Sequence, residues 1–540
     1  MKQFINDRDS VVSQAIDGLI WASVGHQARL DGYPHIKVVV RTDWDKSRVA
    51  LISGGGSGHE PSHAGFVGEG MLTAAICGDV FASPSVDAVL AGIVAVTGEA
   101  GCLLIVKNYT GDRLNFGLAA ERARALGYKV QMIVVGDDVA LPDLPQPRGV
   151  AGTLFIHKII GAMAANETNL DAVTSAAEQI ARRVSSLGMS LDTCSVPGTP
   201  KEDRIKSGMA ELGLGIHGEP GIEQVPFSTA EDAMARVVER LAQHVPAGQL
   251  VALLNNLGGC TPLEMGILAD ALRQSQLGDR IQGMIGPAPI MTSLDMRGFS
   301  LSLFSPTDDD IAALKAPVAP VAWPGYHSTG LLSITPMPTI PSDPAPKASH
   351  DPTVHHIINV CCNILLDSEA DLNTLDAKSG DGDTGSTLAT AAKSLLQKRS
   401  TMPLSDPATL FCSISREISI AMGGSSGVLM AIFFAAASES CSSGQTLRSS
   451  LIAGLKRMQE VGGARRGDRT MIDALEPALD AFDGGLKHAA EAARSGADST
   501  ASITRARAGR ASYVSEDNLV GHNDPGAEAV ARIFEGLAAT

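Results

Sequence analysis

The first residues that could do chemistry lie in a glycine-rich motif, GGGSGHEP, at 54–61. The motif follows a short β-branched run, and ligands of α/β sheets bind at the carboxyl ends of strands. Glycines let a small ligand approach the backbone closely, and His59 could relay a proton or orient a hydroxyl. A flexible turn with an exposed histidine would explain the same letters, and composition does not decide between the two.

A second motif, KNYTGD at 107–112, also follows a strand-like run. Asp112 could act as a general base toward a substrate hydroxyl, and Lys107 could orient an oxygen. A turn with a surface ion pair is the commoner role for such residues.

The third motif is GLGIHGEP at 213–220, and it carries His217. Its glycines match GxGxxG formally, but we reject a dinucleotide site. No β run precedes the motif, and Pro220 blocks the helix that should receive the pyrophosphate. A single histidine on a glycine loop is more often structural than catalytic.

The fourth motif, LDAKSGDGDTG at 375–385, places Asp376, Asp381 and Asp383 in one short segment. Mutual repulsion makes three adjacent carboxylates costly unless a cation lies among them. The EF-hand pattern fails, since Gly385 and Ala392 stand where its later ligands belong. Ligation shared with water and phosphate suits Mg²⁺, which we favour over plain Asp-Gly turn chemistry.

The fifth motif, GGSSG at 423–427, fits the GxSxG nucleophile elbow with Ser425 as the nucleophile. That elbow needs a strand before the serine, and the preceding EISIAM is short and lies in a helical region. A Gly/Ser loop at the start of a helix is instead a good phosphate cradle. No GxxxxGK[ST] occurs, so the chain is not a P-loop enzyme.

Short β-branched runs alternate with helical stretches in the first half, which predicts α/β architecture with a mainly parallel sheet. The expected strands are 38–41, 49–52, 103–106, 130–135, 250–254, 281–285 and 299–304. A break at 195–201 (SVPGTPK) divides this half into two lobes, split near 195.

A Pro-rich segment, 336–352, is the clearest domain boundary. Such linkers are extended and semi-rigid. Beyond it apolar residues recur at helical spacing, as in Ile357, Cys361 and Ile364, and Ala-rich stretches dominate. We therefore expect an α/β domain at 1–335, a linker, and an all-helical domain at 353–540.

The 540 residues carry a formal net charge of −16, which argues against nucleic-acid or anionic-membrane partners. Asp7, Arg8 and Asp9 interrupt any apolar signal segment. The longest apolar run, 428–437, is too short to span a membrane. Eight cysteines without a CxxC pair predict buried thiols in a reducing cytosol.

In their order along the chain, these motifs resemble those of the single-chain, ATP-dependent dihydroxyacetone kinase family. The resemblance rests on GGGSGHEP, KNYTGD, GLGIHGEPG, LDAKSGDGDTGST, MGGSSG, GDRTM and GRASY…DPGA. It implies a two-lobed α/β substrate domain followed by an all-α eight-helix barrel that binds nucleotide. It also implies transfer of the ATP γ-phosphate to a terminal hydroxyl of dihydroxyacetone, with glyceraldehyde as a further substrate, by a cytoplasmic homodimer.

The resemblance assigns roles to individual residues. The histidine matching His217 holds the ketone as a hemiaminal, Asp112 is the base, and His59 assists. The substrate is lined by Gly56, Ser57, Gly58, His59, Lys107 and Asp112. The metal ligands are Asp376, Asp381 and Asp383, which hold two Mg²⁺ ions on the ATP phosphates. The nucleotide contacts are Thr384, Gly385, Ser386, Thr387, Ser425, Ser426, Gly462, Met471, Arg510, Asp524, Pro525 and Gly526.

Some relatives carry His and Asn where this chain has Thr384 and Thr387, which favours the ATP-exchanging branch of the family. Other functions remain open at this point. They are FAD-AMP lyase (FMN cyclase) activity or another short-ketose kinase on the same scaffold, a GxSxG hydrolase using Ser425, and a non-catalytic ligand-sensing regulator. The intact aspartate trio argues against the last.

Overall fold

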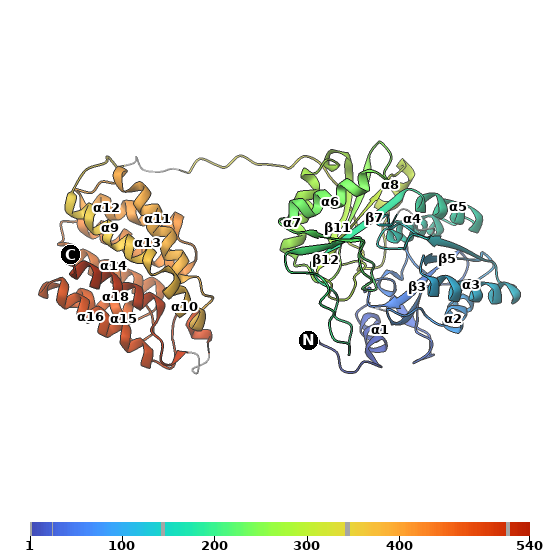
Figure 1. Ribbon diagram of the computed structural model, residues 1–540, viewed down its shortest axis with the longest axis horizontal. Coiled ribbons are helices and arrows are strands. Elements are labelled where there is room, and N and C mark those ends of the chain that lie inside the picture. Colours follow the sequence, from blue (N-terminus) through green and yellow to red (C-terminus); the bar gives the residue numbers. More distant parts are fainter. Residues whose placement is uncertain (1–2, 24, 142–145, 341–345, 515–518) are drawn as a thin grey trace. The chain divides into compact units, whose positions relative to one another are not determined.

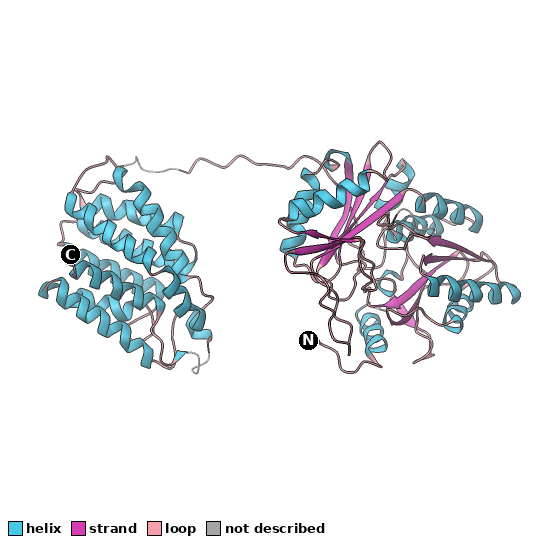
Figure 2. Cartoon of the chain, viewed as in Figure 1, coloured by secondary structure: helices cyan, strands magenta, loops and turns pink. Residues whose placement is uncertain are grey.

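The computed structural model describes residues 3–23, 25–141, 146–340, 346–514 and 519–540. The chain forms two compact units, Met1–Thr335 and Pro336–Thr540 (Figure 1). Among the described residues, strands occur only in the first unit, and the second unit is helical (Figure 2).

The first unit begins with a six-stranded sheet in the order β1-β2-β4-β3-β5-β6. Strands β4, β3, β5 and β6 are parallel, whereas β2 runs antiparallel to both of its neighbours. The strands are β1 Gln27–Arg29, β2 Val38–Arg41, β3 Ala50–Ser57, β4 Ala74–Val80, β5 Cys102–Lys107 and β6 Val130–Val135. The helices of this region are α1 Val11–Ala22, η1 Ala64–Phe66, α2 Val86–Val96, α3 Thr110–Ala125, α4 Thr153–Ala165 and α5 Leu170–Ala181.

A seven-stranded sheet follows, in the order β13-β11-β10-β12-β7-β8-β9. Only β10 and β11 pair in parallel, and the other pairs are antiparallel. The strands are β7 Val184–Ser190, β8 Met209–Leu212, β9 Glu223–Pro226, β10 Leu250–Asn256, β11 Ile281–Ala288, β12 Gly298–Phe304 and β13 Tyr326–Ser328. The helices are α6 Ala230–Ala242, α7 Pro262–Gln274, η2 Gly278–Arg280 and α8 Asp308–Lys315.

The central strands are apolar on both faces because each face lies in a different core. In β5, Leu103 and Ile105 join a core with α4 and the second sheet, whereas Leu104 and Val106 pack with α2 and α3 on the other face. Since successive side chains of a strand point to opposite faces, a continuous apolar run is what such burial requires. In β10, Val251 likewise joins the core that contains α4. That shared core joins the two lobes.

The second unit is a set of packed helices. They are α9 Pro352–Asp367, α10 Glu369–Ser379, α11 Thr384–Lys398, α12 Pro407–Ala421, α13 Gly424–Ser442, α14 Leu447–Gly462, α15 Ile472–Asp480, α16 Leu486–Ser499 and α18 Pro525–Ala538, with short 3₁₀ turns at η3 Arg399–Thr401, η4 Phe482–Gly484, η5 Thr500–Ser502 and η6 Arg510–Tyr513. From α11 to α16 each α-helix packs against the next, α16 packs on α18, and α9 contacts both α11 and α18. Alanines line the contact between α16 and α18, among them Ala489, Ala493 and Ala531, so these helices approach closely.

Two expectations for the fold need correction. The second sheet is mainly antiparallel, because β12 runs against both β10 and β7. The change of sheet also falls before Val184, so the loop at 195–201 lies within the second lobe as part of the β7–β8 connection. A Pro/Gly signal marks a turn, but it does not say whether the chain changes sheet there.

Among the described residues, one helix, α13, is long and apolar enough to cross a membrane by length and composition. It packs between α12 and α14, with Ala431, Phe433 and Ala437 buried. Only 22% of its apolar window is buried within this unit.

Candidate active site

The glycines of the first motif lie inside strand β3, which continues through Ser57. At Gly55, with φ of +146°, an added Cβ would lie 3.1 Å from Nζ of Lys107 and 3.2 Å from Oδ2 of Asp112. The missing side chain therefore leaves a small space between an ammonium and a carboxylate. Among the described residues, no ion pair within 4.0 Å joins Lys107 to Asp112. The ammonium and the carboxylate therefore lie across this space from each other and are not in direct contact.

Lys107 ends strand β5, and Asp112 lies in the first turn of α3, so one strand–helix junction positions both. Their side chains are 0% and 1% exposed. Burial lowers the pKa of Lys107, and the charge of Asp112 opposes that shift. Oδ1 of Asp112 has no hydrogen-bond partner among the described residues, although it is buried. A buried acceptor without a partner is costly, and a ligand hydroxyl would satisfy it.

His59 is fully buried, which excludes the exposed-turn reading of its motif. Its Nδ1 donates to the carbonyl oxygen of Thr292 at 2.8 Å, which leaves Nε2 as the unprotonated nitrogen, without a partner among the described residues. Asn255 on β10 fixes the loop that carries Thr292. Its amide nitrogen donates to the carbonyl oxygen of Met291, and its amide oxygen accepts the backbone N–H of the same residue. Burial and the nearby charge of Lys107 hold the pKa of His59 well below its usual range, so its ring is neutral.

His217 is held by one carboxylate and three rings. Its Nδ1 lies 3.3 Å from Oε1 of Glu219, and its backbone N–H donates to Oε2 of the same side chain at 2.9 Å. The rings of Tyr109, His59 and Phe81 pack edge-on against it, with centroids 4.3, 4.8 and 5.5 Å away. Burial opposes ionisation of Glu219, but its hydrogen bond to His217 prevails and brings its pKa to about 2.

That carboxylate determines which nitrogen of His217 is nucleophilic. An ionised Glu219 can only accept, so Nδ1 carries the proton and the lone pair remains on Nε2. The site therefore presents a nucleophilic ring nitrogen and a carboxylate–ammonium pair, and His59 lies between them, against the His217 ring and within electrostatic reach of Lys107.

The remaining residues expected to line the substrate contribute mainly backbone. The hydroxyl of Ser57 donates to the carbonyl oxygen of Gly78 at 2.8 Å, so it ties β3 to β4. A Cβ at Gly56 would lie 2.8 Å from the backbone nitrogen of Ala82. One at Gly58 would lie 2.8 Å from the ring of Phe81. These glycines allow the ring of Phe81 to pack beside His59.

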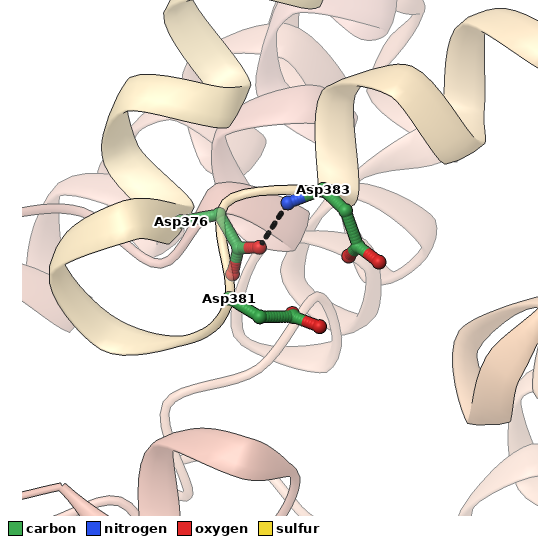
Figure 3. Close-up of side chains that lie close together, drawn as sticks. All are labelled: Asp376, Asp381 and Asp383. Carbon is green, nitrogen blue, oxygen red and sulfur yellow. Dashed lines mark hydrogen bonds between the residues drawn. The ribbon is translucent and has the colours of Figure 1, made fainter. Parts of the chain in front are cut away.

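The carboxylate motif of the second unit joins α10 to α11 (Figure 3). The oxygens of Asp376, Asp381 and Asp383 lie within 4.8 Å of one another. Oδ2 of the buried Asp376 accepts the backbone N–H groups of Gly382, Asp383 and Thr384 at 2.9–3.2 Å. Asp376 thus shapes the loop, and the carboxylates of Asp381 and Asp383 are exposed.

These three side chains suit a divalent cation. They offer hard oxygen ligands at close range, and two of them remain open to water and phosphate, the coordination that Mg²⁺ prefers. Three carboxylates without a cation would repel one another. The motif also leads directly into the N-terminus of α11, where the helix dipole favours an anion, and the N–H groups of Thr384 and Ser386 there already donate to Asp376 and Asn373.

Most residues expected to contact nucleotide lie at helix ends. Thr384, Gly385, Ser386 and Thr387 form the first turn of α11, and Ser425 and Ser426 form that of α13. The hydroxyl of Ser386 donates to Glu369 and accepts from Asn373, so this side chain is already engaged.

Two further helix starts lie beside each other. A Cβ at Gly526 would lie 3.2 Å from that of Met471, which joins the start of α18 to that of α15. Asp524 caps α18 through the N–H of Ala527, and Pro525 is the first residue of that helix. Gly462 ends α14 against Leu429 of α13. The side chain of Arg510 lies outside the described residues.

One argument from the motifs was wrong in detail, and a second is confirmed. A strand, β8, does precede 213–220, but the motif leads into β9 with no helix after it, so the rejection of a dinucleotide site stands. The EISIAM segment before Ser425 belongs mostly to helix α12, so the strand that a nucleophile elbow needs is absent there and the hydrolase alternative fails.

Sequence reasoning missed three residues that shape the site. Glu219 is part of the HGEP letters, and its spacing of two from His217 was an available signal. Phe81 and Thr292 gave no signal, because their contacts with His59 join segments distant in sequence.

Comparison with known proteins divides the chain in the same way as its two compact units. The Dak1 domain family matches residues 22–322, and the DAK2 domain family matches residues 378–539. The chain is 48% identical over 553 residues to a dihydroxyacetone kinase of Citrobacter freundii, covering 99% of this chain and 98% of that protein. It is 38% identical over 575 residues to the triokinase/FMN cyclase of Homo sapiens, with the same coverage.

A crystal structure of the C. freundii dihydroxyacetone kinase in complex with AMP-PNP and Mg²⁺ matches with a TM-score of 0.74 and 46% identity, covering 100% of this chain and 99% of that one. The fold and the site thus define a protein with a Dak1 and a DAK2 domain on one chain. The protein belongs to the dihydroxyacetone kinase family.

Proposed function

We propose that this chain is an ATP-dependent kinase that phosphorylates a terminal hydroxyl of dihydroxyacetone, with glyceraldehyde as a second substrate. The observation that carries the proposal is the small space beside Gly55 between the buried Lys107 and Asp112, together with His217 packed edge-on against the buried His59. The full-length similarity to a dihydroxyacetone kinase supports the choice of substrate.

His217 would bind the ketone covalently. Its Nε2 lone pair adds to the carbonyl carbon, a C–N bond forms, and the carbonyl oxygen takes up a proton to give a hydroxyl. Glu219, ionised beside Nδ1, stabilises the positive charge that develops on the ring and can accept the Nδ1 proton. Glycerol has no carbonyl group, so it cannot be held in this way.

Asp112 and Lys107 would act on the terminal hydroxyl. A hydroxyl between them could donate to Oδ2 of Asp112, the oxygen that faces the space beside Gly55, and accept from Nζ of Lys107. As the hydroxyl oxygen attacks the γ-phosphorus, the bond to the ADP oxygen breaks and the hydroxyl proton passes to Asp112. His59, neutral and unpartnered at Nε2, can accept a hydrogen bond from the substrate.

The second unit would supply ATP and metal. Asp376, Asp381 and Asp383 would hold two Mg²⁺ ions, which neutralise charge on the transferring phosphoryl group. The turns at Thr384–Thr387 and Ser425–Ser426, with Gly462, Met471, Arg510 and Asp524–Gly526, would contact the nucleotide. The order of helix contacts, in which α9 returns to α18, supports an eight-helix barrel formed by α9, α11–α16 and α18.

At the level of the whole protein we propose a substrate domain at 1–335, a linker at 336–352 and a nucleotide domain at 353–540. We further propose a cytoplasmic homodimer. The match of two consecutive family domains to the two units supports the division of the chain.

The test is ATP consumption by the purified chain with dihydroxyacetone, with glycerol, and with dihydroxyacetone plus excess EDTA. We expect activity only in the first assay. Equal rates with dihydroxyacetone and glycerol would overturn the ketone-specific reading, and undiminished activity in EDTA would overturn the metal assignment.

A second candidate is cyclisation of FAD to riboflavin cyclic phosphate. The similarity to a human triokinase/FMN cyclase over 99% of the chain favours it. Incubation with FAD and a divalent cation, followed by chromatography for AMP and the cyclic product, decides whether this chain has that second activity.

A further inference from the structure

Lys107 has a hydrogen-bond partner, His63, that has no role in the reaction proposed above. Its Nζ donates to Nε2 of His63 at 2.8 Å. His63 comes directly before η1, and its side chain, like that of Lys107, is buried. Because both side chains are buried, this contact is shielded from solvent.

The hydrogen bonds around His63 permit only one tautomer. The hydroxyl of Ser53 donates its single proton to the carbonyl oxygen of Ile105 at 2.7 Å. The same oxygen lies 3.5 Å from Nδ1 of His63, so toward His63 it can only accept. Nδ1 must therefore carry the proton, and Nε2 has the lone pair that Lys107 needs. Burial and the charge of Lys107 hold the pKa of His63 well below its usual range, which keeps this ring neutral.

The contact explains why Lys107 and Asp112 remain apart. An ammonium and a carboxylate attract each other strongly in a buried, low-dielectric site. Asp112 and, more distantly, Asp137 both act on Lys107. Without another acceptor, the flexible lysine would close on Asp112 and occupy the oxygen that the substrate hydroxyl needs.

We infer that His63, as the neutral Nδ1–H tautomer, is a positioning residue that holds Lys107 away from Asp112, so that both flank the reacting hydroxyl. The inference rests on the proposed kinase function for its catalytic consequence. The tautomer and its partner belong to the protein itself and can be tested separately.

Three variants of the full chain test the catalytic consequence. His63→Leu removes the acceptor, and we expect kcat with dihydroxyacetone to fall roughly ten- to a hundredfold, the range for one hydrogen bond to a charged group. KM should change less, because His217 still forms the adduct. His63→Gln places an amide oxygen near the position of Nε2 and should recover most of the lost kcat.

His157 provides a matched control. It is as deeply buried, its ring lies 5.2 Å from that of His63, and neither of its ring nitrogens has a hydrogen-bond partner among the described residues. His157→Leu should leave kcat near that of wild type. Equal losses in the Leu and Gln variants of His63, or wild-type kcat in His63→Leu, would overturn the inference, provided thermal unfolding shows that each variant is folded.

A readout without turnover separates this inference from the proposed function. In the chain labelled with ¹⁵N-histidine, the signals of His63, assigned by their loss in His63→Gln, should show a protonated Nδ1 and an unprotonated Nε2. Lys107→Met should shift the Nε2 signal. A protonated Nε2 would refute the positioning role even in an active kinase. A wild type that cannot phosphorylate dihydroxyacetone, but shows the expected tautomer, would refute the proposed function alone.

Discussion

At the scale of single residues, the proposed mechanism combines covalent capture at His217 with proton transfer at Asp112. We expect His217→Ala to reduce kcat/KM for dihydroxyacetone by a factor on the order of 100, because the adduct no longer fixes the hydroxyl. Asp112→Asn should lower kcat by about 10²–10⁴, the usual contribution of a general base. Initial rates at varied ketone concentration separate the two effects. Adduct formation, detected by reductive trapping and intact mass, should survive in Asp112→Asn and disappear in His217→Ala.

Gly55 tests whether the space between Lys107 and Asp112 is used by substrate. The methyl group of Gly55→Ala would lie 3.1–3.2 Å from both polar ends, at a φ of +146° that alanine rarely adopts. We expect kcat/KM to fall roughly tenfold or more, as overpacking costs elsewhere suggest. Gly18→Ala in α1, where nothing lies within 4 Å of the new methyl, is the control. If kcat/KM of Gly55→Ala equals that of wild type, the substrate hydroxyl does not occupy the space beside Gly55.

The residues of this site could be named from the sequence only where a motif contained them. For His217, Lys107 and Asp112, residue type and spacing alone favoured a structural role, and only the resemblance of the ordered motifs to a family assigned them to a site. The roles of His63 and Glu219 depend on which nitrogen of a histidine ring faces which partner. That geometry arises only when β3, β5 and the 213–220 loop meet.

At the scale of elements, helix starts in the second unit are tied together by buried polar side chains. Arg469 is 1% exposed, and its guanidinium donates to the carbonyl oxygens of Leu519 and His522 at 3.0 and 2.7 Å. It also lies beside Asp524, whose pKa burial raises to about 6. Arg469 thereby fixes the segment that leads into α18.

We expect Arg469→Met to raise KM for ATP roughly tenfold while leaving KM for dihydroxyacetone unchanged, because the segment before Asp524 loses two charge-assisted hydrogen bonds. Steady-state kinetics with each substrate varied in turn checks this. Arg457→Met, an exposed arginine on α14, serves as the control. A rise in both KM values, or in neither, would contradict the assignment.

Glu528 on α18 joins that helix to α16 through an ion pair with Arg494 at 2.6 Å, and it also pairs with Arg532 one turn along its own helix at 2.9 Å. Burial opposes its ionisation, but the hydrogen bonds to the two arginines prevail and lower its pKa to about 2. A folded-state pKa below the unfolded one contributes stability at neutral pH that is lost as the pH falls from about 4.5 toward 2. Glu528→Gln should therefore lower the Tm of the second unit by roughly 5 °C at pH 7, and the curves of variant and wild type should converge as the pH approaches about 2. A constant difference at every pH would contradict this.

Elements were predictable where local composition agreed with burial. The β-branched runs at 38–41 and 130–135 coincide with β2 and β6. Strand β7, with the sequence VSSLGMS, lacks such a run, and its strand character comes from pairing with β12 and β8. The antiparallel order of the second sheet was likewise missed, because pairing direction depends on distant partners.

At the scale of the whole molecule, the described hydrophobic cores divide cleanly between the two units. Each core cluster draws its residues from one side of the 336–352 segment. Each unit therefore has the apolar burial that independent folding needs. Under the proposed function the ketone and ATP bind to different units, so we expect the rate of phosphoryl transfer to depend on the segment that joins them.

Cutting the chain within 341–345, which lies outside the described residues, should therefore separate folding from catalysis. With a protease site inserted there, we expect two fragments that each unfold cooperatively, since no core loses a residue. Turnover should fall on dilution of the cut protein and recover as its concentration rises. In the uncut chain the tether holds each unit at an effective concentration in the millimolar range for the other, whereas the cut units must meet by diffusion. The uncut protein with the same insertion controls for the inserted residues, and its specific activity should not depend on concentration. Activity of the cut protein that persists unchanged at nanomolar concentration would show that the units bind each other without the tether, and loss of cooperative unfolding in either fragment would show that the boundary is misplaced.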